Sequence, residues 1–293
     1  TPLYSSAASD VYKRQLLAHN EEDPFNAFIH IDLPNSGLLV NIGIKDNIDV
    51  KGMITSAGSL ALSNNYPSRD AFLISKLRSS NYHIYGKTNL SEWANFRSFN
   101  SVSGWSSFGG QTVNPHGKNR NPCGSSSGSA VAVASGILDI AIGTETNGSI
   151  SCPASVNGIV GMKPSVGLVS RSGIVPISST QDTAGPMGKT VMIVAKTLEV
   201  IAGEDPLDAS TLNIPNNFDF NLSKNLNKNS LKNKRFGLLD SGSDDEEGQK
   251  LLNKITKVIT SRGGDVVEIQ DTRVYPGEEE FFLLLYEFER DLE

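Results

Sequence analysis

Two clusters of serine and glycine, separated by a helix-like segment and an apolar run, constrain this chain more than any other feature. The first cluster, residues 124–129, reads GSSSGS, and the second, residues 147–151, reads NGSIS. Between them, residues 128–135 have the small side chains of a closely packed helix, and Gly136 is placed to end it. Residues 137–143 are typical of a buried strand. This arrangement can bring two serine hydroxyls together, and the N–H groups of such glycine-rich turns can converge on an anion.

The remaining apolar patterns predict a chain that mixes helices and strands. Strands are expected at residues 38–44, 82–85, 235–240 and 266–269. Helices are expected at residues 71–79, 191–202, 245–262 and 278–293. The last two strands flank a helix, which predicts a β-α-β unit with parallel strands. Residues 203–233 are rich in Asn and irregular, so we expect a surface connection there.

Composition narrows the classes of partner. The 26 Lys and Arg residues against 32 Asp and Glu residues give a net charge of −6, which argues against nucleic acid or an anionic membrane as the main partner. The apolar runs are too short to span a bilayer. The two cysteines, Cys123 and Cys152, flank the serine clusters and are too few for a disulfide scaffold. A bridge stays open if the clusters adjoin, but we expect reduced thiols.

Familiar hydrolase and nucleotide motifs do not fit. The letters GSSSG match a nucleophile elbow, which needs a strand before the serine and a histidine after it. Here Asn121 and Pro122 precede the motif, and no histidine follows His116 in this sequence, so that interpretation fails unless a C-terminal part supplies one. Residues 143–148 have phosphate-loop spacing, but Ser-Ile follows in place of Lys-Ser/Thr. We see no metal motif and expect neither a metal nor another cofactor.

The two clusters resemble the motifs of the amidase signature family, G-G-S-S-G-G-S-A and T-D-T-G-G-S-I-R-x-P-A. Their order and their spacing (149 − 125 = 24) match the family interval. The resemblance implies that Ser149 is the nucleophile and Ser125 a relay serine. It also implies that Lys45 is the base, since I-K-D-N at residues 44–47 matches the family's V-K-D-N. The peptide bond before the relay serine is cis in the family, which we carry to the bond between Gly124 and Ser125.

The resemblance assigns further residues around this triad. The backbone N–H groups of Thr146, Asn147, Gly148 and Ser149 would form the oxyanion hole. Ser126 and Glu145 would hold these residues in place without contacting the substrate. Ser127 is expected to cap the following helix. Lys45 could accept a proton only if burial disfavours its charged form.

The resemblance also implies a fold and a domain organisation. We expect an α/β protein with the amidase signature fold, in which a mixed, largely parallel central sheet is covered by helices on both faces. Residues 1–15 resemble translated sequencing-adapter sequence, so we treat them as a non-native leader. Residues 16–293 would be the amidase signature domain, truncated at its C-terminus. It would contain the core motifs at 38–202, the connection at 203–233 and the β-α-β unit at 234–270.

The function implied is hydrolysis of a carboxamide, with release of ammonia or an amine through an acyl-enzyme intermediate. Glu145, Asn147 and Ser151 stand where the family pattern has Asp, Gly and Arg, and this combination resembles the branch of bacterial peptide amidases. We therefore expect a small-molecule or peptide amide as substrate, including C-terminal peptide amides. Two alternatives stay open: the catalytic A-type subunit of a glutamine-dependent amidotransferase, and an inactive fragment.

We expect a cytoplasmic protein, with a periplasmic location open because the natural start is missing.

Overall fold

The computed structural model describes residues 23–32, 39–240, 246–270, 272, 274 and 276–293. The expected leader at residues 1–15 lies outside them. The chain divides into two compact units, Thr1–Phe220 with Leu283–Glu293 and Asn221–Phe282. The helices of the described part include none that is long and apolar enough to cross a membrane.

The first unit is built on one six-stranded sheet. Its strands, in spatial order, are β1 (Phe28–Ile31), β3 (Tyr82–Thr88), β2 (Val40–Lys45), β6 (Ile140–Glu145), β8 (Thr183–Gly188) and β7 (Val160–Gly161). The predicted mixed sheet is therefore confirmed, but it is less parallel than predicted. Of these six strands, β3, β2 and β6 run parallel, and β1, β8 and β7 are antiparallel to their neighbours.

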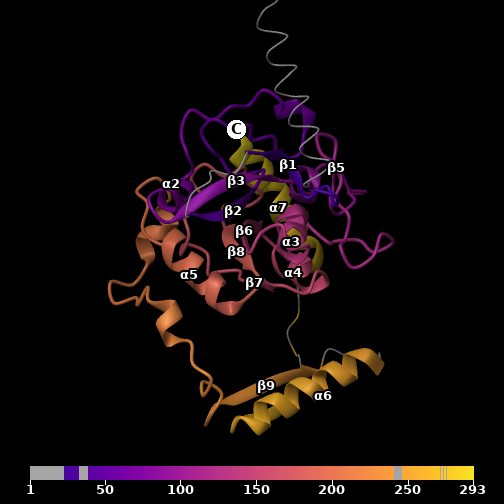
Figure 1. The fold of residues 1–293 in the computed structure, drawn as a ribbon, viewed down its shortest axis with the longest axis vertical. Helices are drawn as coiled ribbons and strands as arrows, with labels where there is room; N and C mark the ends of the chain where they lie inside the picture. The colour runs from indigo at the N-terminus through magenta and orange to yellow at the C-terminus, as the bar shows by residue number, and fades with distance from the viewer. Residues whose placement is uncertain (1–22, 33–38, 241–245, 271, 273, 275) are drawn as a thin grey trace, which may run out of the picture. The chain divides into compact units, whose positions relative to one another are not determined.

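Helices cover both faces of this sheet, as predicted. On one face, α3 (Ser127–Ala134) lies over the central strands beside α4 (Ser151–Val156). On the other face, α2 (Phe72–Arg78) packs with α5 (Val191–Ile201) (Figure 1). The small side chains of α3 permit close packing, and Gly128 is required because a Cβ there would lie 2.1 Å from the Ala27 carbonyl oxygen. Gly136 follows the helix with φ +86°, in the left-handed conformation expected of a glycine that ends a helix.

Several predicted elements have nearly the expected bounds, and two are displaced. Strand β3 continues beyond Tyr85 to Thr88. Strand β6 begins three residues later than the predicted 137, because Leu138, although buried, donates its N–H to the Ala132 carbonyl in α3. The short elements of this unit are η1 (Leu60–Leu62), η2 (Glu92–Asn95), β4 (Trp105–Ser106), β5 (Gly110–Gln111) and η3 (Ala209–Asn213).

The C-terminal helix α7 (Gly277–Leu292) contributes its last residues to the first unit. Phe288 packs against the rings of Trp93 and Phe96 at centroid distances of 6.2 and 5.3 Å. Glu287 is buried and accepts hydrogen bonds from the hydroxyls of Ser178 and Thr180. The end of α7 is thereby tied to the segment between β7 and β8.

The second unit contains the predicted β-α-β arrangement. Its elements are η4 (Leu222–Asn225), β9 (Arg235–Asp240), α6 (Glu246–Ser261) and β10 (Asp265–Gln270). Strands β9 and β10 pair in parallel in register, Phe236 opposite Val266 and Leu238 opposite Glu268, which confirms the predicted parallel pair. The amphipathic α6 packs against β10.

Candidate active site

Lys45 is the last residue of β2, and its side chain is completely buried on the face of the sheet covered by α3. Its Nζ lies 2.7 Å from Ser125 Oγ and 2.7 Å from Thr144 Oγ1. A third oxygen, the carbonyl of Thr144, is 3.3 Å away. Every polar contact of the amine is thus to a neutral oxygen, and the described part of the chain provides no carboxylate in hydrogen-bonding distance of it.

The protonation of Lys45 follows from this environment. Burial lowers the pKa of Lys45 from its ordinary value of 10.5 to about 7, and the negative charges of Asp182 and Glu145 oppose part of that shift. A lysine with such a pKa is neutral in a substantial fraction of molecules at neutral pH. It can therefore accept a proton from a neighbouring hydroxyl.

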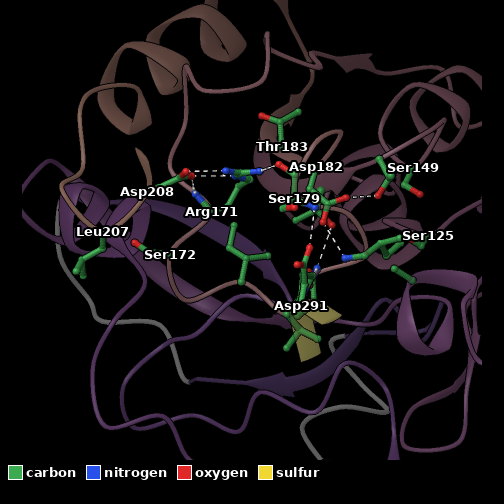
Figure 2. A pocket seen from close by; sticks show the side chains of 18 residues that line it. Ser125, Ser149, Arg171, Ser172, Ser179, Asp182, Thr183, Leu207, Asp208 and Asp291 are labelled. Carbon is green, nitrogen blue, oxygen red and sulfur yellow. Dashed lines mark hydrogen bonds and ion pairs between the residues drawn. The ribbon is translucent and has the colours of Figure 1, made fainter. Parts of the chain in front are cut away.

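The structure brings the two candidate serines into one pocket. The Gly124–Ser125 peptide bond is cis, as the resemblance implies. Ser125 and Ser149 both line a cavity of about 280 Å³, and the backbone N–H of Ser126 donates to the carbonyl of Ser149 at 3.1 Å. Figure 2 shows the two serines at one end of this pocket. Ser125 is fully buried and Ser149 is 8% exposed, so Ser149 is the one of the two that an incoming ligand can reach.

Ser126 links the first motif to β6. Its hydroxyl accepts from the Thr144 N–H and donates to the Thr144 carbonyl, both at 3.1 Å. This close approach depends on Gly143, where a Cβ would lie 2.7 Å from Ser126 Oγ. The capping role expected of Ser127 is wrong: Ser126 occupies the N-cap position, and Ser127 is the first helical residue, whose hydroxyl donates to the carbonyl of Cys123. The helix therefore begins at Ser127, one residue earlier than expected.

Glu145 supports the turn that carries Ser149. Its carboxylate accepts the N–H groups of Ile150 and Ser151, each at 2.7 Å. Burial alone would raise the pKa of Glu145, but hydrogen bonds from Ser151, Ile150 and Gly148 outweigh it and hold this pKa below its usual range. The Glu145 carboxylate thus fixes the turn at residues 146–149, which contains the predicted oxyanion-hole donors.

The two cysteines form a disulfide, so the expectation of reduced thiols is wrong. Cys123 and Cys152 are bonded, with their Cα atoms 6.0 Å apart. The reason is spatial: Cys123 directly precedes Gly124, Cys152 lies in the first turn of α4, and the two serine motifs adjoin. The bridge therefore joins the segment before Ser125 to the helix after Ser149.

Other pocket residues were missed because they come from segments that carry no motif. Arg171 pairs with Asp208 through two hydrogen bonds of 2.9 and 2.6 Å, at the end of the pocket opposite the serines (Figure 2). Although burial opposes it, the hydrogen bonds from Arg171 hold the pKa of Asp208 well below its usual range. Asp208 belongs to the stretch expected to be a surface connection, yet it is only 6% exposed. Asp291, from α7, lines the same cavity.

Asp182 has the bracing role that its loop position suggests, and it also faces the site. Its carboxylate accepts the N–H groups of Ile177 and Ser178 at 2.7 and 2.9 Å, and it accepts the hydroxyl of Thr146. Burial raises the pKa of Asp182, and these hydrogen bonds oppose the rise. Asp182 therefore holds together the turn before Ser149 and the segment that leads into β8.

Comparison with known proteins shows the family to which the chain belongs. The model of a family described as Amidase matches residues 33–290. The chain belongs to the amidase family. Among the relatives, the chain is 43% identical over 233 residues to a probable amidase of Arabidopsis thaliana, covering 78% of this chain and 44% of that protein. It is 37% identical over 247 residues to a glutamyl-tRNA(Gln) amidotransferase subunit of Saccharolobus solfataricus, covering 84% and 49%. The chain thus spans less than half the length of these two curated relatives.

Solved structures of the amidase family have the same fold. The native peptide amidase from Stenotrophomonas maltophilia superposes with a TM-score of 0.86 at 41% identity, covering 98% of this chain and 63% of that one. An amidase family protein from Bacillus anthracis superposes with a TM-score of 0.87 at 34% identity, covering 95% and 60%. The mixed sheet with helices on both faces is therefore the amidase fold.

Proposed function

We propose that this site hydrolyses carboxamides with Ser149 as nucleophile, Ser125 as proton relay and Lys45 as general base. Ser149 Oγ attacks the amide carbon while its proton passes to Ser125, whose own proton passes to Lys45. The C–N bond then breaks as the proton returns by the same path to the departing nitrogen, which leaves as ammonia or an amine. Water releases the acyl group from Ser149 as a carboxylic acid by the same relay, which restores the three side chains.

One observation carries this proposal: a completely buried lysine, with a pKa lowered to about 7, lies 2.7 Å from the hydroxyl of Ser125. Serine is a weak nucleophile until a base takes its proton, and a base works best when its pKa lies near the operating pH. Lys45 meets both the geometric and the electrostatic requirement. The polar partners of Ser125 include no histidine among the described residues.

The negative charge that develops on the substrate oxygen also needs a site. We assign it to the backbone N–H groups of Thr146, Asn147 and Ser149, in the turn that Glu145 and Asp182 hold in place. The N–H of Gly148, the fourth donor expected from the sequence, is directed to the Glu145 carboxylate instead. Preorganised donors of this kind stabilise a tetrahedral intermediate, and loss of one costs about 3 kcal/mol in the barrier. Because Glu145 holds the turn in place, little reorganisation is needed when the charge appears.

We propose a C-terminal peptide amide as the substrate class. Support comes from the departures at Glu145, Asn147 and Ser151 and from the likeness to a structure described as a native peptide amidase. The cavity of about 280 Å³ next to Ser149 has room for a small acyl group with its carboxamide. Its far end, at Arg171 and Asp208, offers polar groups to the rest of such a substrate.

The test measures labelling and turnover together. A fluorophosphonate probe should label Ser149, and Ser149→Ala should abolish both labelling and release of ammonia from a panel of amides that includes C-terminally amidated peptides. Ser125→Ala should lose most turnover, while Ser126→Ala, which removes the link to Thr144, should lose less. Labelling on Ser125 or Ser126 in the wild type would contradict the assignment. Full turnover in Ser125→Ala, with loss in Ser126→Ala, would move the relay by one residue.

A second candidate is the catalytic A-type subunit of a glutamine-dependent amidotransferase. It is favoured by the 37% identity, over 84% of this chain, to the glutamyl-tRNA(Gln) amidotransferase protein of Saccharolobus solfataricus. The same triad would then release ammonia from glutamine for a partner protein. Ammonia release that requires glutamine and a co-purifying partner would support this candidate, and release from simple amides by the protein alone would support the first.

A further inference from the structure

Thr144, in β6, provides two of the three oxygens around the Lys45 amine. It stands at the first position of the second motif, but the family resemblance assigned it no role. Its hydroxyl oxygen is 2.7 Å from Lys45 Nζ, and its carbonyl oxygen is 3.3 Å away. The third oxygen is Ser125 Oγ at 2.7 Å. Thr144 is 8% exposed and lines the same pocket as the two serines.

The number of hydrogen atoms on the amine decides what these three contacts mean. A neutral amine has two N–H groups and one lone pair. If both N–H groups donate to the two oxygens of Thr144, the lone pair remains for the third contact, which is the hydroxyl of Ser125. Ser125 must then donate its proton to Lys45, and its own lone pairs stay available to accept the proton of Ser149. The direction of the relay would follow from the position of Thr144.

We propose that Thr144 is a positioning residue, whose hydroxyl and carbonyl oxygens bind the two N–H groups of Lys45 and so direct the lysine lone pair at Ser125 Oγ. This inference rests on the function proposed above and deepens it. Thr144 touches neither the substrate nor the reacting carbonyl in this account. It acts through Lys45.

Thr144 is itself held rigidly, as a positioning residue must be. The Ser126 hydroxyl forms hydrogen bonds of 3.1 Å with both the backbone N–H and the carbonyl of Thr144. The side-chain amide of Asn47 donates to the hydroxyl oxygen of Thr144 at 3.1 Å. With Lys45 and Asn47 as donors, both lone pairs of this hydroxyl are used, which fixes its orientation.

The hydroxyl also affects the acidity of Lys45. In the ammonium form all three N–H groups find an acceptor, so the Thr144 hydroxyl stabilises the charged form more than the neutral one. The charged groups that act on Lys45 are Asp182, from the connection before β8, and Glu145, at the end of β6; Asp46, next in sequence, is paired with Lys87. Removing the hydroxyl should therefore lower the pKa of Lys45 further, while the two carboxylates stay in place.

The test compares Thr144→Val with Thr144→Ser in the full protein. Thr144→Val keeps the shape and removes the hydroxyl, so kcat should fall roughly 10- to 100-fold with little change in KM. The ascending limb of the pH–rate profile should move to lower pH by about one unit, since the ammonium form of Lys45 loses a hydrogen-bond acceptor on which it depends more than the neutral amine does. Thr144→Ser keeps the oxygen and should restore both kcat and the limb to near the wild-type values.

A matched control separates this effect from the loss of any buried hydroxyl. Thr197 on α5 is fully buried, and its hydroxyl donates to the Ile193 carbonyl at 2.9 Å, on the opposite face of the sheet. Thr197→Val should change thermal stability and leave the ascending limb of the pH–rate profile at its wild-type pH. If Thr144→Val does not fold, Thr144→Ala replaces it, with the same expected shift.

A readout without turnover distinguishes failure of this inference from failure of the proposed function. NMR titration of the labelled lysine side chains should show the Lys45 pKa lowered in Thr144→Val and unchanged in Thr144→Ser and Thr197→Val. If Thr144→Val leaves both kcat and the Lys45 pKa at wild-type values, the inference is overturned. Full activity in Lys45→Ala would refute the proposed function instead, and the titration would still report whether Thr144 binds the amine.

Discussion

Lys45 and Lys87 are both completely buried and lie on neighbouring strands of the same sheet, yet their environments differ in one respect. Lys87 Nζ is 3.1 Å from the carboxylate of Asp46, and it also donates to the Ile54 carbonyl and the Thr55 hydroxyl. Lys45 has three oxygen partners as well, but all are hydroxyls or carbonyls. Burial lowers the pKa of both lysines, and only Lys87 has a directly paired carboxylate to oppose it.

The two side chains also point to opposite faces of the sheet. Thr88 follows Lys87 and bonds the hydroxyl of Ser129 on α3 at 2.7 Å, so Lys87 itself must face away from α3. Lys45 faces Ser125, just before α3. If Lys45 is the general base that we propose, burial alone does not explain that role, because Lys87 is buried as well. The lysine must also lack a paired carboxylate and must touch a hydroxyl whose proton it can accept.

Exchange of Lys45 should have the largest effect on activity. Lys45→Ala removes the base, so kcat at neutral pH should fall by roughly 10²- to 10⁴-fold. Lys45→Arg should fail as well, because a guanidinium stays charged and cannot accept the proton. Steady-state ammonia release measures both, and circular dichroism should show that the fold is kept. Substantial activity of Lys45→Arg at neutral pH would mean that another residue is the base.

Exchange of Lys87 should act on stability. Lys87→Met leaves the buried Asp46 carboxylate unpaired, which should cost about 3–5 kcal/mol in the free energy of unfolding. The double variant Lys87→Met/Asp46→Asn removes both charges and should recover part of this loss. Urea unfolding measures both variants. A loss below about 1 kcal/mol, the value of an exposed pair, would show that Lys87 and Asp46 are not a coupled buried pair.

The smallest expected effect comes from a more distant charge. The negative charge of Asp182 raises the pKa of Lys45, so Asp182→Asn should lower that pKa and move the ascending limb of the pH–rate profile to lower pH. The exposed pair of Asp139 with Lys189 provides a control, since Asp139→Asn should leave the limb in place. A limb that moves to higher pH in Asp182→Asn would contradict the electrostatic account of Lys45.

The sequence was most informative where a motif fixes local geometry. Local patterns predicted the position of Lys45 at a strand end and the helix after the first serine motif. The cis bond before Ser125 was implied by the family resemblance and not by any local pattern. The sequence also predicted the parallel pair in the second unit. The catalytic and oxyanion roles of the residues at the site stay predictions until the variants are measured.

Features that depend on distant contacts were missed. The disulfide between Cys123 and Cys152 and the burial of Asp208 with Arg171 both require the tertiary arrangement, which local sequence does not report. Thr144 stands at the first position of the second motif, but it was given no role, because a threonine at the end of an apolar strand is also typical of a strand residue without function. Its importance depends on which side chain faces it across the sheet, and that side chain is Lys45.

The pH dependence of kcat/KM for the wild type tests the central claim most directly, because it reports the pKa of the essential base in the free enzyme. With Lys45 as the base, kcat/KM should rise with pH through about 7, where the lysine loses its proton, and should then level off. The same limb should be present for several amide substrates, since it belongs to the enzyme. A profile that is flat across this range, or that rises only near the ordinary lysine value of 10.5, would contradict a neutral Lys45 as the base.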